Sequence, residues 1–214
     1  MTKFKLYGFA QSGNSYKAAL MLNLIGADWE PIPVDFFVGE TFTQEYRARV
    51  NQMGEVPVLL HRDKKLTQTG VILTYLSETS GKFKAKNEED RLEVLRWILF
   101  DNHKVTSFIA THRLLASLRK GSADPAVVEF LRARVFANLK IVDLHLEKRK
   151  YLVGDFPTIA DISVAGYLYY PPEEHHFDIQ KEFPAVNTWR DRIKELPGWK
   201  HPYDILPQPP SGIK

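Results

Sequence analysis

The 214-residue chain contains no cysteine. This absence excludes disulfides, a protein thiol nucleophile and a thiolate metal site, and it is compatible with a reducing compartment. No apolar run approaches the length of a membrane span. Residues 1–7 alternate like a strand and lack the apolar region of a signal peptide. We therefore expect a soluble, cytoplasmic protein with no membrane partner.

An excess of charge of one sign is also missing. The chain has 29 Lys and Arg residues against 26 Asp and Glu residues, which gives a net charge of +3. This bias is too weak to indicate a nucleic-acid partner. Hydrophobic residues make up 44% of the chain, enough for a core in one large domain or two small ones.

Metal and phosphate motifs are absent as well. The sequence has no H-E-x-x-H run and no Gly-rich loop followed by Lys-Ser or Lys-Thr. Residues 173–176, Glu-Glu-His-His, offer metal-ligand side chains, but they are consecutive and follow two prolines. Adjacent side chains do not converge on one ion, so we expect a solvated patch and no metal.

The first eighty residues carry a β-α-β-α-β-β-α pattern. A β-α-β start implies a parallel crossover, and a closing hairpin adds antiparallel strands. The predicted elements are a strand at 3–9, a helix from Asn14 or Ser15 to Gly26, a strand at 29–34, a helix at 43–50, hairpin strands at 56–61 and 64–67, and a helix at 69–78.

The rest of the chain is helical in pattern. Thr158 and Asp161 form a capping box before an apolar run. Residues 202–214 are rich in proline, and we expect them to loop over the surface. We predict an α/β domain at 1–80, a linker at 81–87 and an all-helical domain at 88–214. The predicted helices cover residues 91–118, 126–146, 162–168 and 183–196.

Two short segments of the hairpin have the features of a ligand site. A Val-Pro bond is one that becomes cis at modest cost, and Val56-Pro57 precedes a strand. At the start of an edge strand, a cis bond would turn the Val56 backbone toward an extended peptide. Gln68-Thr69 stands where a helix begins, and helix N–H groups there bind carboxylates. The pattern fits either a site for a small acidic peptide or an ordinary hairpin with a proline at its rim.

Four motifs in this order resemble the glutathione transferase family. They are Ser12–Lys17, Gly54–Pro57, Leu66–Thr69 and Thr158–Asp161. The resemblance covers nearly the whole chain. It implies a thioredoxin-like N-terminal domain, an all-α C-terminal domain, glutathione as co-substrate and a homodimer.

The resemblance also implies a thiol-activating loop after the first strand. A free thiol has a pKa of about 8.5, so the protein must stabilise its anion with hydrogen-bond donors and a helix N-terminus. Ser12 matches the catalytic serine of the serine-type, bacterial-like members. Asn14 falls where other subgroups carry a Thr-x-Asn pair or a cysteine. Ser15 is the third candidate, with helix capping as its more expected role.

Glutathione-binding roles follow from the same resemblance. Val56 would pair with the cysteinyl backbone, Pro57 would be cis, and Gln68 and Thr69 would bind the γ-glutamyl group. Thr69 replaces the usual serine. Glu55 stands where relatives often have lysine or glutamine near the glycyl carboxylate, so it would repel that group unless it turns to solvent.

A second substrate would lie between the domains, against the helix that begins near Glu88. Large aromatic side chains at helical spacing are more often core than pocket. Asp101 is also a candidate to reach the glutathione of a partner subunit. The candidate residues are Trp97, Phe100, Asp101, His103 and Phe108.

Three functions follow from these patterns. The leading hypothesis is a transferase that activates the glutathione thiol for attack on a hydrophobic electrophile. The second is a glutathione-dependent disulfide or peroxide reductase, which without cysteine must work through bound glutathione only. The third is a non-catalytic, transferase-like module that binds a protein partner or holds a ligand.

Overall fold

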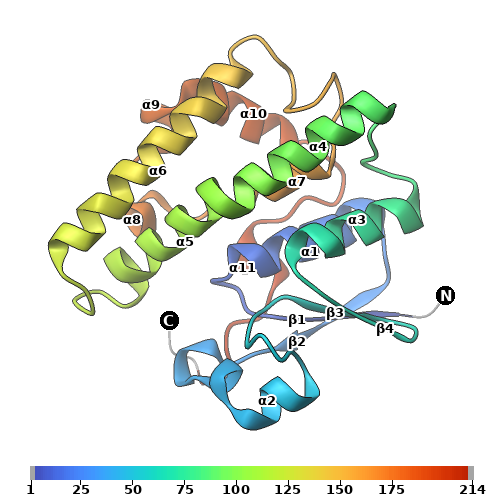
Figure 1. Cartoon of the computed structure of the whole chain (residues 1–214), viewed down its shortest axis with the longest axis vertical. Helices are drawn as coiled ribbons and strands as arrows, with labels where there is room; N and C mark the ends of the chain where they lie inside the picture. Colours follow the sequence, from blue (N-terminus) through green and yellow to red (C-terminus); the bar gives the residue numbers. More distant parts are fainter. Residues whose placement is uncertain (1–2, 212–214) are drawn as a thin grey trace. The chain divides into compact units, whose positions relative to one another are not determined.

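The computed structural model describes residues 3–211 and divides the chain into two compact units (Figure 1). Unit 1 comprises Met1–Lys82 and Leu196–Lys214, and unit 2 comprises Phe83–Glu195. The predicted domain of 88–214 therefore differs from unit 2 at its C-terminal end. Residues after 195 join unit 1 because the short helix α11 (Pro202–Ile205) packs against α1 (Gly13–Ile25).

A four-stranded mixed sheet forms the centre of unit 1. Strand β1 (Phe4–Gly8) pairs in parallel with β2 (Trp29–Pro33) and antiparallel with β3 (Val58–His61). Strand β4 (Lys64–Thr67) pairs antiparallel with β3, so the strand order is β2-β1-β3-β4. This confirms the predicted parallel crossover and closing hairpin.

The predicted edge position of the strand after Pro57 is wrong. Strand β3 lies between β1 and β4, and the edges of the sheet are β2 and β4. Proline is tolerated here because Pro57 comes one residue before the strand begins. Its missing N–H therefore removes no bond from the ladder.

The helices of unit 1 bury an apolar core against the sheet. Figure 1 shows α1 and α3 (Thr69–Ser80) together on one face of the sheet. The two helices contact each other, α1 also contacts β1, and α3 also contacts β4. Leu20, Met21 and Leu22 of α1 are fully buried. The chain between β2 and β3 forms two 3-10 turns, Phe36–Val38 and Glu40–Phe42, and helix α2 (Gln44–Arg49).

Unit 2 is a bundle of helices. The predicted helix at 91–118 is one helical stretch from Glu88 to Leu118 that is interrupted by a π-helical turn at Asp101–Val105 and ends in a second one at Leu114–Leu118. The short helices α8 and α9 were not predicted. The α-helices are α4 (Glu88–Phe100), α5 (Thr106–Arg113), α6 (Pro125–Leu146), α7 (Ile159–Ala165), α8 (Pro172–His175), α9 (Ile179–Glu182) and α10 (Pro184–Lys194).

The predicted capping box is confirmed, and it anchors more than one helix. The buried Asp161 carboxylate accepts from the Thr158 N–H at 2.8 Å and the Leu152 N–H at 2.9 Å. It also accepts from the indole N–H of Trp189 in α10, at 2.9 Å. The capping residue therefore joins the start of α7 to the preceding loop and to α10. Within residues 3–211, no helix combines the length and apolarity needed to cross a membrane.

Candidate functional site

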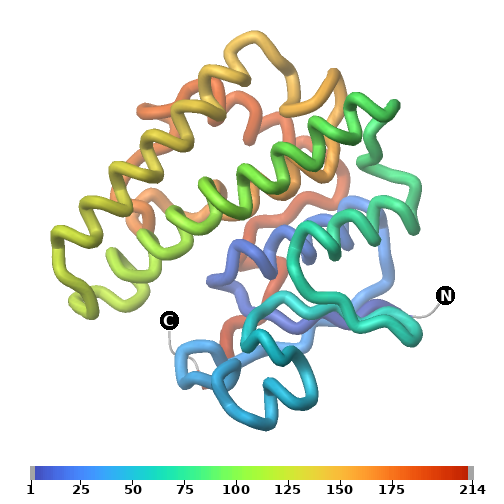
Figure 2. The backbone as a smooth tube through the Cα atoms, viewed as in Figure 1, coloured from blue at the N-terminus to red at the C-terminus, as the bar shows by residue number. Residues whose placement is uncertain are grey.

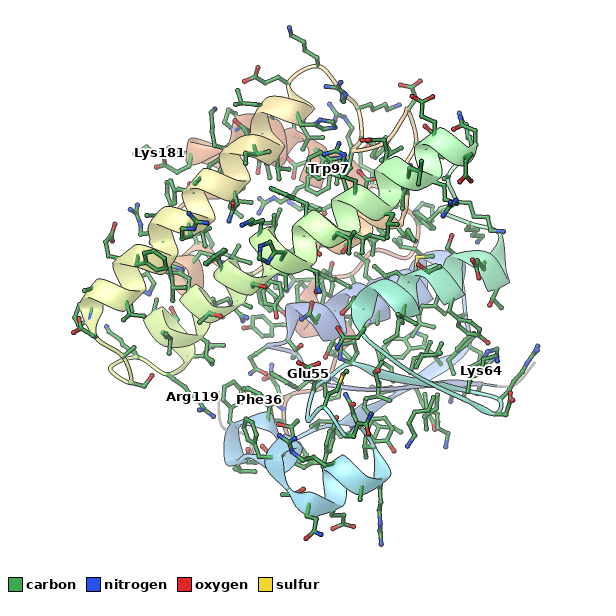
Figure 3. The ribbon with its side chains drawn as sticks, in the orientation of Figure 1. Phe36, Glu55, Lys64, Trp97, Arg119 and Lys181 are labelled. Atoms are coloured by element: carbon green, nitrogen blue, oxygen red, sulfur yellow. The ribbon has the colours of Figure 1, made fainter. Side chains whose placement is uncertain are left out.

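The register of the sheet brings three predicted segments to one end of unit 1. Tyr7 of β1 lies opposite Val58, and Val58 lies opposite Thr67 of β4. The turn after β1, the Val-Pro step before β3 and the residues after β4 therefore share this end. Figure 3 shows Glu55 here, with Lys64 at the opposite end of the hairpin.

Ser12 is the N-cap of α1. Its N–H donates to the Phe9 carbonyl at 3.1 Å, and its side-chain oxygen accepts from the Ser15 N–H at 3.1 Å. The capping role expected for Ser15 therefore belongs to Ser12, and the helix begins at Gly13. The hydroxyl that the resemblance assigns to catalysis lies at the positive end of a 13-residue helix.

Asn14 and Ser15 point to different surroundings. Ser15 is fully buried, and its Cβ and Oγ would lie 2.7 Å from a Cβ added at Gly8. Glycine at position 8 thus allows α1 to approach β1, and Ser15 serves this close packing. Asn14 is half-buried, and its amide oxygen is buried without a hydrogen-bond partner in the part of the chain that the structure describes. The Ser15 hydroxyl is likewise without a partner among the described residues, so the difference in burial alone makes Asn14 the more accessible of the two to a ligand.

The backbone around the Val-Pro step is held by two residues that the sequence patterns did not single out. The Val56-Pro57 bond is cis. The Glu55 carbonyl accepts from the Tyr46 hydroxyl at 3.0 Å and from the Asn51 side-chain amide at 3.0 Å. Burial, and then the negative charge of Glu40, raises the pKa of Tyr46, so the phenol remains a donor. The available signal for Tyr46 was that it is the one aromatic side chain in the stretch Gln44–Arg49.

Gln68 and Glu55 contact each other directly. The Gln68 side-chain amide donates to the Glu55 carboxylate at 2.9 Å. Glu55 is exposed to solvent, as the condition for avoiding repulsion required, and from there its carboxylate also contacts Gln68. Gln68 has a φ of 66°, uncommon for a residue other than glycine, and Thr69 next to it is buried.

Trp97 and Asp101, two of the predicted second-substrate residues, belong to the interior of unit 2. Trp97 is buried, and its ring lies 4.6 Å from that of His145. The buried Asp101 carboxylate accepts from Thr106 at 2.8 Å and from Ser163 at 2.6 Å. Asp101 is thus placed to stabilise the π-helical turn, and its position gives no support to contact with a partner's ligand.

The remaining second-substrate candidates are more accessible than Trp97 and Asp101. His103 is exposed, whereas Phe100 and Phe108 are half-buried. These accessibilities leave the three residues available to contact a ligand.

The segment Glu173–His176 is not the expected solvated patch. Glu174 accepts from the buried Arg113 side chain at 2.7 Å, and His175 is fully buried. Consecutive side chains on a helical turn point in different directions, so the carboxylates and imidazoles of this segment do not converge on one point. Across residues 3–211, no three His, Asp or Glu side chains form a group that could hold a metal ion.

Unit 1 is a thioredoxin-like α/β unit and unit 2 is all-helical. Models of two protein-family domains match these two parts of the chain. The model of the glutathione S-transferase N-terminal domain matches residues 2–78, and that of the C-terminal domain matches residues 105–197. The chain belongs to the glutathione S-transferase family.

Individual relatives resemble the chain along nearly its whole length. Glutathione S-transferase 3 of Zea mays is 29% identical over 98% of this chain and 97% of its own length. A crystal structure of a glutathione S-transferase from Xanthobacter autotrophicus Py2 is 32% identical, with a TM-score of 0.84 over 94% of this chain and 97% of that chain. A family member from Pseudomonas fluorescens Pf-5, solved with two glutathione bound, shares the fold with a TM-score of 0.78 at 23% identity over 91% of this chain and 89% of its own.

Proposed function

We propose that the chain is a serine-type glutathione transferase in which Ser12 stabilises the thiolate of bound glutathione. One observation supports this most: Ser12 caps α1 at the same end of the sheet as the cis Val56-Pro57 step and the start of α3. The register brings the Ser12 hydroxyl and the Val56 backbone to one end of the sheet, which supports the proposal that the first binds the thiolate and the second the peptide.

The proposed chemistry uses the first turn of α1. The Ser12 oxygen accepts from the Ser15 N–H, so the hydroxyl hydrogen can donate to a thiolate. The first N–H groups of a helix have no partner within the helix, and here they belong to Gly13 and Asn14. These donors lower the thiol pKa, and the thiol proton leaves to solvent. The sulfur then forms a bond to an electrophilic carbon, and the leaving group departs with its electron pair.

The peptide portion of glutathione would lie along the remaining residues. The Val56 backbone would pair with the cysteinyl unit, while Gln68 and Thr69 would bind the γ-glutamyl group, as the family resemblance implies. The anchored Glu55 carbonyl supports this role, because Tyr46 and Asn51 fix the peptide unit that precedes Val56.

We also propose a homodimer in the cytoplasm. Helix α4 exposes Leu92, Leu95 and Leu99, at spacings of three and four residues that place them on one face. A second copy of the chain would cover this apolar face. The complete lack of cysteine supports the cytoplasmic location.

Calorimetric titration with glutathione and with glutathione disulfide tests the proposal. We expect binding of glutathione and turnover of a soft electrophile. Ser12→Ala and Asn14→Ala should each reduce kcat, Ser12→Ala by about a hundredfold, because a donor to the developing anion is lost. A clear preference for the disulfide would favour the reductase, and binding of neither ligand would favour the non-catalytic module. If a competent enzyme loses no rate in either variant, the site assignment is wrong.

A further inference from the structure

The C-terminal segment of unit 1 lies along the helix that begins at Ser12. The Tyr16 hydroxyl donates to the Lys200 carbonyl at 2.8 Å. Further along, Ile205 and Leu206 are buried, and α11 packs on α1. The segment is therefore built into the unit before it reaches the candidate site.

Beyond α11 the segment binds the turn between β1 and α1. The Ala10 N–H donates to the Pro207 carbonyl at 3.1 Å. The side-chain amide of Gln11 donates to the Gln208 side-chain oxygen at 2.7 Å, and Gln11 is 3% exposed. Ala10 and Gln11 are the two residues between Phe9 and Ser12. The segment thus holds the middle of the turn that places the Ser12 hydroxyl.

The same segment then reaches the chain that follows β2. The Ser211 N–H and hydroxyl donate to the two carboxylate oxygens of Asp35, at 2.8 and 2.7 Å. Phe36, the next residue, stacks on Phe9 with ring centroids 5.0 Å apart. Figure 2 shows the red C-terminal tube reaching the blue segment that contains these residues. Residues 207–211 thereby join the turn that leads to Ser12 to the chain that follows β2.

We propose that residues 207–211 are a positioning element for Ser12, acting through the pair Gln11 and Gln208. This inference rests on the proposed function. The hydroxyl position depends on the turn from Phe9 to Ser12, and a displacement of about 1 Å at a catalytic group can cost about a hundredfold in rate. The Gln11–Gln208 bond joins positions 197 residues apart, so it ties the turn to a distant part of the chain.

The matched variants Gln208→Ala and Gln208→Glu test this role. Alanine removes the oxygen that accepts from Gln11, whereas glutamate keeps it. Ser211→Ala weakens the attachment of residues 207–211 to Asp35 without changing Gln11. The readouts are the pH midpoint of thiolate absorbance of bound glutathione, kcat and KM for each substrate, and the thermal midpoint.

We expect Gln208→Ala to raise the pH midpoint of the bound thiol by about one unit and to lower kcat about tenfold, with KM for glutathione little changed. Gln208→Glu should restore both values, and Ser211→Ala should move them in the same direction by less. Variants that lower only the thermal midpoint, with the wild-type pH midpoint retained, would overturn the positioning role alone. A wild-type protein that binds glutathione without ionising its thiol, or does not bind it, would overturn the proposed function and this inference with it.

Discussion

The side-chain amide of Gln68 donates a 2.9 Å hydrogen bond to the carboxylate of Glu55, which joins the start of α3 to the segment before β3. Gln68 has a left-handed φ, and this bond ties its side chain to Glu55. The glutamate that the resemblance made an unfavourable neighbour for glutathione is thus a partner of a residue proposed to bind glutathione.

Two substitutions of Glu55 distinguish the effect of its charge from the effect of its hydrogen bond to Gln68. We expect Glu55→Ala to weaken glutathione binding about five- to tenfold, since the loss of one hydrogen bond costs about 1 kcal/mol. Glu55→Gln should keep the affinity, because its amide oxygen still accepts from Gln68. Calorimetry on both variants checks this. An equal loss in the two variants would show that the charge, not the bond to Gln68, is what matters.

Asp161→Asn should destabilise the protein by about 3 kcal/mol. An asparagine has one acceptor oxygen, so it cannot accept from Leu152, Thr158 and Trp189 together, and buried donors without partners are costly. The exposed Asp155→Asn is the control, with an expected change within about 0.5 kcal/mol. Chemical denaturation measures both. Similar stabilities for the two variants would contradict the anchoring role of the capping box.

Stability should fall as the pH drops below the ordinary pKa of histidine because of His175. Burial, and then the positive charge of Arg113, lowers the pKa of His175 to about 3. The unfolded chain, with a histidine pKa of about 6.5, therefore binds this proton more readily between pH 6.5 and 3. The stability that the protein gains by keeping His175 neutral is complete above pH 6.5 and is lost below it. The free energy of unfolding then falls by at most about 1.4 kcal/mol per pH unit.

The free energy of unfolding should be measured between pH 7 and 5, because most carboxylates titrate below this range. His175→Gln should flatten the pH dependence in this range, although it lowers stability at pH 7. The exposed His103→Gln should retain the wild-type slope. A His175→Gln protein that loses stability with falling pH as steeply as the wild type would refute the assignment.

Leu95→Glu should convert the proposed dimer to a monomer. Leu95 lies on the exposed apolar face of α4, and a buried, unpaired charge opposes association. Sedimentation velocity measures the mass, with the exposed Lys181→Glu as a charge-changing control. A wild-type monomer, or a Leu95→Glu dimer of unchanged affinity, would argue against this face as the interface.

Local patterns predicted most of the fold and the segments that form the candidate site. Alternation and capping signals predicted the strands and the box at Thr158, and the register of β1, β3 and β4 then brings the predicted segments together. The contacts that were missed join distant positions. Asp35 and Ser211 are 176 residues apart, and Arg113 and Glu174 are 61 apart, so no local periodicity reports either pair. Ser12 was not predicted as the cap because serine is a good N-cap at position 15 as well.

The ionisation of bound glutathione is the most direct test of the account. Thiolate absorbance of the complex, followed against pH, gives the pKa of the bound thiol in the wild type and in Ser12→Ala. We predict a wild-type pKa at least one unit below the free value of about 8.5, and a return toward that value in Ser12→Ala. A bound thiol with an unshifted pKa in the wild type, or an equally low pKa in Ser12→Ala, would contradict the proposed role of Ser12.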